Sequence, residues 1–93
     1  MPAIYRYEVP VDDQRHRIKL FDGGTDNSIV GVGCRKHGVV EFWAVHSDGG
    51  EDMGRLRVFT VVGTGHQLPQ DVRHVWGHCV DGPFVWHLIE VQP

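Results

Sequence analysis

Apolar and polar side chains alternate along much of this chain with a period of two residues. From Ile4 to Val9, and again from Arg15 to Leu20, successive positions divide into two faces. Successive side chains of a β-strand point to opposite sides, so this period is typical of strands with one buried face. No stretch of the chain shows a convincing helical period. The pattern therefore predicts an all-β protein.

Five further apolar segments, separated by turns or loops that contain glycine, continue this pattern. They span residues 28–36, 39–46, 55–62, 71–80 and 84–91. Fifteen valines against two alanines also favour strands over helices. Tight hairpin turns are predicted at His37-Gly38 and at Asp81-Gly82, because glycine adopts the positive φ that such turns require. We expect one domain, residues 1–93, folded as a small antiparallel β-sandwich of about seven strands.

Two glycines interrupt the segment 28–36, at Gly31 and Gly33. Glycine inside a strand leaves room where another residue would project a side chain, and it often marks a bulge. We therefore expect that a large ring packs across this strand or that a bulge bends it.

The last predicted hairpin carries apolar side chains on both of its faces. A turn at Asp81-Gly82 places Trp76 opposite His87. The expected core face carries Val75, Cys79, Phe84, Trp86 and Leu88. The other face is too apolar for an ordinary solvated surface, so we expect another strand or a second copy of the protein to cover it partly. The residues expected at this interface are Trp76, His78, Val85, His87 and Ile89.

Charge and composition exclude some classes of partner. A net charge of −3 with scattered basic residues argues against nucleic-acid binding, because phosphate recognition needs a concentrated basic surface. The apolar runs are far shorter than the ~20 residues that cross a bilayer, and the first ten residues lack the apolar core of a signal peptide. We expect no membrane partner and a location in the cytoplasm. Cys34 and Cys79 lack metal-site spacing, so we expect free thiols, with a single disulfide as the alternative.

A cluster of turn-forming and polar residues follows the strand predicted at 55–62. Its members are Gly63, Thr64, Gly65 and His66, with Asp71 a few residues on. One interpretation is an anion site, because successive backbone N–H groups of a Gly-x-Gly turn can cradle a phosphate or a carboxylate. The other is a tight connection between strands, since Pro69 soon follows and no helix is predicted after the turn. The sequence favours the connection and leaves the anion site open.

Other groups of chemically active side chains give little support for a metal site or for catalysis. His74 and His78 lie ~13 Å apart along a strand, too far to share an ion, and the pair formed by His78 and His87 lacks a third ligand. The acidic loops 22–26 and 48–52 lack the spacing of a calcium loop, so we interpret them as solvated turns. No serine or cysteine lies in a recognisable nucleophile arrangement. We expect no enzymatic activity, no cofactor and no metal.

Four segments spread over the chain resemble an uncharacterised family of short proteins. They are residues 4–7, 42–45, 59–71 and 86–90, and the most specific part is the Gly-Thr-Gly-His-x-Leu-Pro-x-Asp segment that begins at Gly63. Such proteins are encoded by tailed bacteriophages and by bacteria that carry prophages. The resemblance implies a phage-type accessory protein in the cytoplasm of a bacterial host, and it brings no known activity with it. The acidic insert 47–54 departs from the usual pattern of the family.

Three functions are compatible with these observations. The first is a binding protein that self-associates and presents a surface to a host or phage protein. The second is a small-molecule binder that sequesters an anionic metabolite or a nucleotide at the turn from Gly63 to His66. The third is a minor component of the virion.

Overall fold

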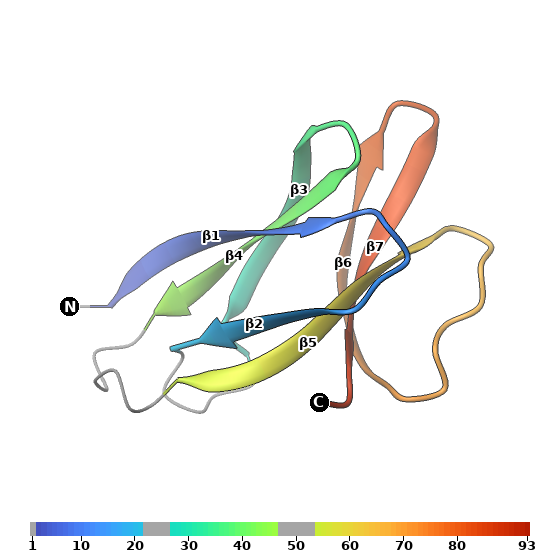
Figure 1. Ribbon diagram of the computed structural model, residues 1–93. Helices are drawn as coiled ribbons and strands as arrows, with labels where there is room; N and C mark the ends of the chain where they lie inside the picture. The colour runs from blue at the N-terminus through green and yellow to red at the C-terminus, as the bar shows by residue number, and fades with distance from the viewer. Residues whose placement is uncertain (1, 22–26, 47–53) are drawn as a thin grey trace.

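The computed structural model describes residues 2–21, 27–46 and 54–93 of the 93-residue chain (Figure 1). All regular structure in these residues is β-strand, and no helix that could cross a membrane occurs among them. The expected all-β fold of about seven strands is therefore confirmed. The strands are β1 (Ala3–Pro10), β2 (His16–Leu20), β3 (Ile29–Lys36), β4 (Val39–His46), β5 (Arg55–Gly63), β6 (Val72–Asp81) and β7 (Phe84–Val91).

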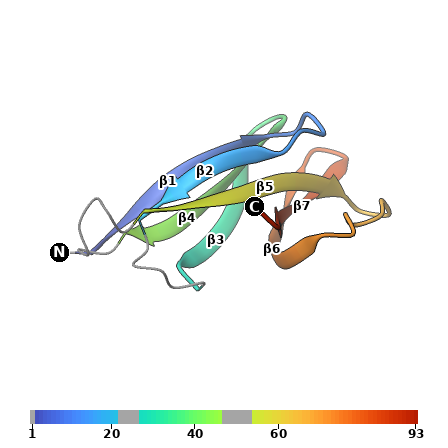
Figure 2. The same cartoon turned by 60° about the horizontal axis from the view of Figure 1, so that its bottom comes forward.

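The strands form two antiparallel sheets, which Figures 1 and 2 show as two layers. The three-stranded sheet has the order β1-β4-β3, and the four-stranded sheet has the order β2-β5-β7-β6. Every paired neighbour is antiparallel. The chain changes sheet after β1, after β2 and after β4, so the four-stranded sheet combines β2 from the first half of the sequence with three strands from the second half, whereas the three-stranded sheet comes from the first half alone. This arrangement is the antiparallel sandwich that the alternation predicts.

Apolar side chains from alternate positions of both sheets fill the space between them. Phe42 of β4 and Phe59 of β5 are fully buried, and their ring centroids lie 4.8 Å apart across the core. Val40 and Val61 continue the same faces of these two strands. Burial of a side chain of this size contributes about 1.5–3 kcal/mol, so this layer is the main source of stability.

The outer face of the three-stranded sheet shows why β3 contains two glycines. The indole of Trp43 on β4 lies across β3, and a Cβ built on Gly33 would lie 3.4 Å from its ring, with 3.9 Å for Gly31. The pairing of β3 with β4 also shifts register twice, between Ile29 and Gly31 and between Gly33 and Lys36. Both of the expected explanations, a ring that packs across the strand and a bulge, are therefore confirmed.

One side of the sandwich is closed by contacts between β3 and β6, the edge strands of the two sheets. Cys34 and Cys79 form a disulfide, with their Cα atoms 6.0 Å apart. Nearby, a Cβ on Gly77 would lie 3.1 Å from a methyl carbon of Val32, so glycine permits this close approach. The expectation of free thiols was therefore wrong. It failed because sequence spacing does not show that the two segments become facing edges.

The register of the last hairpin also differs from the prediction. Asp81 pairs with Phe84, so the turn consists of Gly82 and Pro83 rather than Asp81 and Gly82. Gly82 has a φ of 57° and proline follows it, which matches a type II′ turn with glycine at the first central position. A second difference is the register shift between Val75 and Gly77. This bulge turns Trp76 towards the core and leaves Val75 exposed.

Candidate functional site

The glycine turn lies at the end of β5 and is held by its own backbone. The Thr64 N–H donates to the Val85 carbonyl at 3.2 Å, and the His66 N–H donates to the Gly63 carbonyl at 3.1 Å. Gly65 has a φ of 91°, which only glycine adopts without strain. Two of the amides that an anion would need are therefore already donated within the protein.

Gly63 brings the turn into contact with the adjacent strand β7. A Cβ at this position would lie 3.2 Å from the indole of Trp86 and 3.3 Å from the ring of His66. Both distances are shorter than ordinary van der Waals contact, so any larger residue would push one of the rings away. The missing side chain therefore allows both rings to lie beside the turn.

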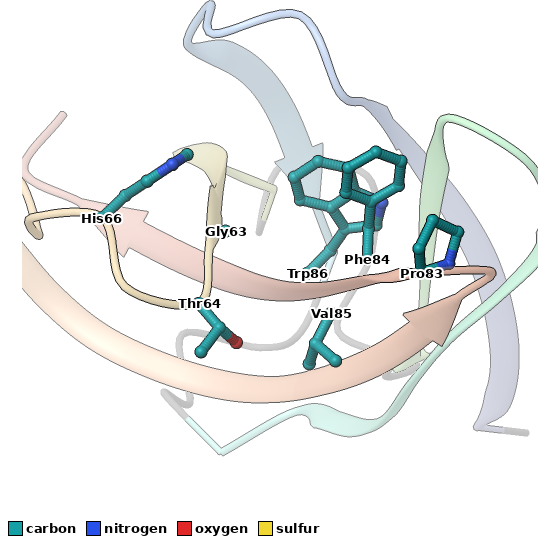
Figure 3. A pocket seen from close by; sticks show the side chains of 7 residues that line it. All are labelled: Gly63, Thr64, His66, Pro83, Phe84, Val85 and Trp86. Atoms are coloured by element: carbon teal, nitrogen blue, oxygen red, sulfur yellow. The ribbon is translucent and has the colours of Figure 1, made fainter.

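A hollow of about 390 Å³ opens between this turn and the β6–β7 hairpin (Figure 3). We call it the aromatic hollow, because the stacked rings of Phe84 and Trp86 form one of its walls, with centroids 5.2 Å apart and planes 17° apart. Phe84 is 46% exposed, so a large aromatic surface faces the solvent beside the ring of Trp86. The residues that line the hollow are Gly63, Thr64, His66, Pro83, Phe84, Val85 and Trp86.

The position of Trp86 is fixed by a buried carboxylate. Its indole N–H donates to Asp81 at 3.0 Å, and Asp81 also accepts from the Gly38 amide and contacts Nδ1 of His37, both at 2.9 Å. The Gly38 hydrogen bond, followed by those of His37 and Trp86, lowers the pKa of Asp81 to about 2. Asp81 is thus an anion at neutral pH, and it joins the turn between β3 and β4 to the aromatic wall.

A second, smaller hollow lies on the other side of the glycine turn. Its volume is about 240 Å³, and Leu68 of the loop 64–71 lines it together with Val62 and Ile89 of the four-stranded sheet. Arg15 holds the far end of this loop through two hydrogen bonds to Asp71, at 2.6 and 2.8 Å. The loop is therefore tied to the segment between β1 and β2, and the turn separates two concave surfaces.

The chain as a whole is similar to a known domain family. The profile of one domain family matches residues 1–93. The chain belongs to the DUF7352 family, a domain of unknown function. No curated protein and no solved structure matches this DUF7352 chain. The expected membership of an uncharacterised family is thereby confirmed, and the link of DUF7352 to phages stays a prediction.

The residues predicted for a ligand site in the DUF7352 chain separate into three groups. Gly63, Thr64 and His66 line the aromatic hollow, whereas Gly65 lines only the smaller one. Asp71 lines neither hollow, and its carboxylate is engaged by Arg15. The turn thus contributes to a concave surface, but its walls are aromatic and apolar rather than cationic.

The five residues predicted for an interface do not form one exposed surface. His78 and His87 are neighbours on the outer face of the sheet, with ring centroids 5.8 Å apart, and Val85 shares that face. Ile89 also lies on it but is fully buried, in a cluster with Val58 and Val91. A partner could therefore reach only part of the predicted set.

Trp76 is the member of that set on the opposite side of the sheet. The bulge turns its indole inward, where the N–H donates to Glu90 at 2.9 Å. Arg57 holds Glu90 through two further hydrogen bonds at 2.8 and 2.6 Å, and both side chains are nearly inaccessible. Burial raises the pKa of Glu90, but the hydrogen bonds from Arg57 and Trp76 outweigh it, so the pKa lies below its ordinary value. This network is an internal support of the DUF7352 fold.

The described part of the DUF7352 chain brings no three His, Cys, Asp or Glu side chains together in a way that could hold a metal ion. The acidic loops 22–26 and 48–52, which the sequence predicts to be solvated turns, lie outside the described residues.

Sequence reasoning missed the aromatic wall itself. The alternation predicts Phe84 and Trp86 in the core. Trp86 does pack against the core, but Phe84 lies beside the turn and is exposed. Asp81 was assigned to the turn rather than to the strand. The signal that could have found the wall is the Phe-x-Trp spacing directly after Gly82-Pro83, because alternate residues share one face.

Proposed function

We propose that this chain is a phage-type accessory protein that acts by binding a host or phage protein, and that the aromatic hollow receives an apolar side chain of that partner. The observation that carries the proposal is the stacked pair formed by the exposed Phe84 and the partly buried Trp86 in a concave surface. Tryptophan and other aromatic residues dominate binding energy at interfaces when they lie in desolvated pockets.

The rigidity of the hollow supports the same function. The indole N–H of Trp86 donates to Asp81, and Gly63 packs against the Trp86 ring. The ring is therefore held in one position before a partner binds. Preorganised contacts bind more tightly because less side-chain entropy is lost. An anionic ligand at the turn is less favoured, since the Thr64 and His66 amides are engaged within the protein.

The state of the carboxylates supports a function without catalysis. A general acid near neutral pH needs a raised pKa. Here the Arg35 hydrogen bond, with further help from Arg6, lowers the pKa of the buried Glu41 to about 2, despite the opposing effect of burial. Asp81 and Glu90 are also lowered by their hydrogen bonds. These groups stabilise the fold as anions, and we infer that the protein is not an enzyme.

The disulfide favours a second candidate function, a minor component of the virion. Disulfides persist on virion surfaces and in other oxidising environments, and they are rare in the bacterial cytoplasm. Cys34 and Cys79 would then stabilise the protein after release from the host. The test is to purify phage particles and to search for this chain in them by mass spectrometry. A chain found only in the host cytoplasm, with both thiols reduced, would exclude this candidate.

The binding function is tested by capture of partners from host lysate with wild-type protein and two variants. Phe84→Asp places a charge in the aromatic hollow, and Val80→Asp places the same charge on the other face of the hairpin, where Val80 is 66% exposed. We expect the wild type and Val80→Asp to retain the same partner and Phe84→Asp to lose it. Retention by Phe84→Asp would contradict the proposal. Loss with Val80→Asp alone would move the contact to the face of His78 and His87.

A further inference from the structure

The two sides of the sandwich differ in how their sheet edges are protected. On one side, the disulfide and the close contact of Val32 with Gly77 hold the edges β3 and β6 together. On the other side, β1 is the edge of the three-stranded sheet and pairs only with β4 in the part of the chain that is described. β1 is also a long edge strand, with eight residues. An unprotected edge of this kind is a template for another strand.

The pairing with β4 shows which backbone groups of β1 face outward. The Val11 N–H donates to the Gly38 carbonyl at 2.9 Å and continues the ladder beyond Pro10, which is opposite Val39. Backbone groups alternate in direction along an antiparallel strand, so odd-numbered residues of β1 face β4. The N–H and C=O groups of Ile4, Arg6 and Glu8 therefore face the free edge. Pro10, which has no N–H, adds only a carbonyl there.

The charges on the side chains of these residues are complementary to those of a second copy of β1. Ile4, Arg6 and Glu8 project from the outer face of the sheet, where Ile4 is 61% exposed and the two charged side chains are 40% and 39% exposed. In a symmetric dimer, two copies of β1 can pair antiparallel about a two-fold axis. The outer faces of both copies then lie on the same side of the joined sheet only if even-numbered residues of one strand lie opposite even-numbered residues of the other. Three registers near the centre of the strand satisfy this condition, with the axis through Arg6, through Tyr7 or through Glu8.

These registers differ in the charges that they bring together. An axis through Arg6 pairs Arg6 with its own copy, and an axis through Glu8 does the same for Glu8. Like charges directly opposite each other are destabilising, whereas opposite charges stabilise a pair. Only an axis through Tyr7 places Arg6 opposite Glu8 of the partner subunit.

We propose that the protein forms a dimer in which the β1 strands of two copies pair antiparallel about Tyr7. In this dimer the outward amides of Ile4, Arg6 and Glu8 donate to carbonyls of Pro10, Glu8 and Arg6 of the partner subunit, and one continuous sheet spans both copies. In the single chain, Arg6 donates hydrogen bonds to Glu41 and, at 2.8 Å, to Glu8. In the dimer Arg6 keeps the hydrogen bond to Glu41 and exchanges Glu8 of its own chain for Glu8 of the partner subunit. The aromatic hollow lies on other strands, so the dimer is independent of the proposed binding function.

The test is the mass in solution of the wild type and of two charge-reversal variants, measured by sedimentation equilibrium at one concentration. We expect the wild type to have twice the mass of one chain. Arg6→Glu brings two acidic pairs together and Glu8→Arg two basic pairs, so each should weaken the dimer roughly ten-fold or more. Mixed in equal amounts, the two variants restore both attractive pairs and should form a heterodimer. Arg73→Glu on β6, which reverses a charge in the other sheet and away from β1, should leave the mass unchanged.

Rescue by mixing separates the dimer from a simple loss of folding. Arg6→Glu leaves Arg35 on Glu41, and circular dichroism of each variant checks that the sheets persist. A heterodimer that forms from two monomeric variants supports the register about Tyr7. A monomeric wild type, or variants that dimerise as tightly as the wild type, would overturn the proposal.

Discussion

Reduction of the disulfide between Cys34 and Cys79 is expected to destabilise the protein by a large fraction of its total stability. The bridge closes a loop between residues that are 45 positions apart. In the chain-entropy description, a cross-link of this span removes about 4 kcal/mol of conformational freedom from the unfolded state. A domain of 93 residues is typically stable by only about 5–14 kcal/mol, so the loss is substantial.

The assay is thermal unfolding with and without a reductant such as a phosphine. For a domain of this size each kcal/mol shifts Tm by about 4–8 °C, so reduction should lower Tm by roughly 15–30 °C. Reduction is preferable to substitution as the first perturbation because Cys79 is only 8% exposed. Reduction keeps both sulfur atoms in the protein, whereas substitution of a cysteine by alanine would add the cost of a cavity.

Substitutions provide the control. Cys34→Ala already breaks the bridge, so the further change Cys79→Ala should cost only the small loss of buried volume. The two changes are therefore non-additive, as expected for residues that act as one unit. The reasoning would be refuted if complete reduction, verified by the mass of the alkylated protein, moved Tm by less than about 3 °C. Two reactive thiols in the native, unreduced protein would refute it equally.

Three further predictions concern internal supports of the site. Glu90→Gln leaves Arg57 as a buried charge without its carboxylate and should cost ~3–5 kcal/mol in chemical denaturation; an unchanged midpoint would contradict the role of this pair. Asp81 has its pKa lowered from 3.8 to about 2, chiefly by the Gly38 amide, so its stabilising effect is complete above pH 3.8 and is lost as the pH falls through about 2. Asp81→Asn should therefore lower Tm at neutral pH, and the difference from the wild type should shrink between these two pH values; a constant difference would contradict the assignment. Gly63→Ala places a Cβ 3.2 Å from the Trp86 ring and should change the tryptophan fluorescence and weaken partner capture, whereas a normal spectrum would show that the wall adapts.

The alternation of side chains was sufficient to predict the strands because it is a local signal. Val40 and Phe42 of β4 point to the core as period two requires. The glycines of β3 were informative for the same reason, since a missing side chain implies a neighbour that fills the space, here Trp43. These features depend on a few adjacent residues and on general rules for sheets.

Pairing between distant strands could not be predicted in the same way. The disulfide depends on β3 and β6 becoming facing edges of different sheets, and nothing in the spacing of Cys34 and Cys79 encodes that arrangement. The bulge at Trp76 also depends on contacts with other strands that the local sequence does not show. It exchanges the faces of two neighbouring residues because Glu90 and Arg57 offer the indole a buried partner.

The turn between β6 and β7 shows how a failed local prediction can indicate a site. Asp81 and Gly82 are good turn residues, yet Asp81 stays in the strand because Gly38, His37 and Trp86 bind its carboxylate. These three hydrogen bonds, two of them with the distant turn between β3 and β4, thus outweigh a local preference, and the turn begins one residue later. The same shift places Phe84 opposite Asp81, on the face of β7 that also carries Trp86. Local rules are expected to fail at functional or strained sites, and here the overriding contact is the one that orients the aromatic wall, where we propose that the partner binds.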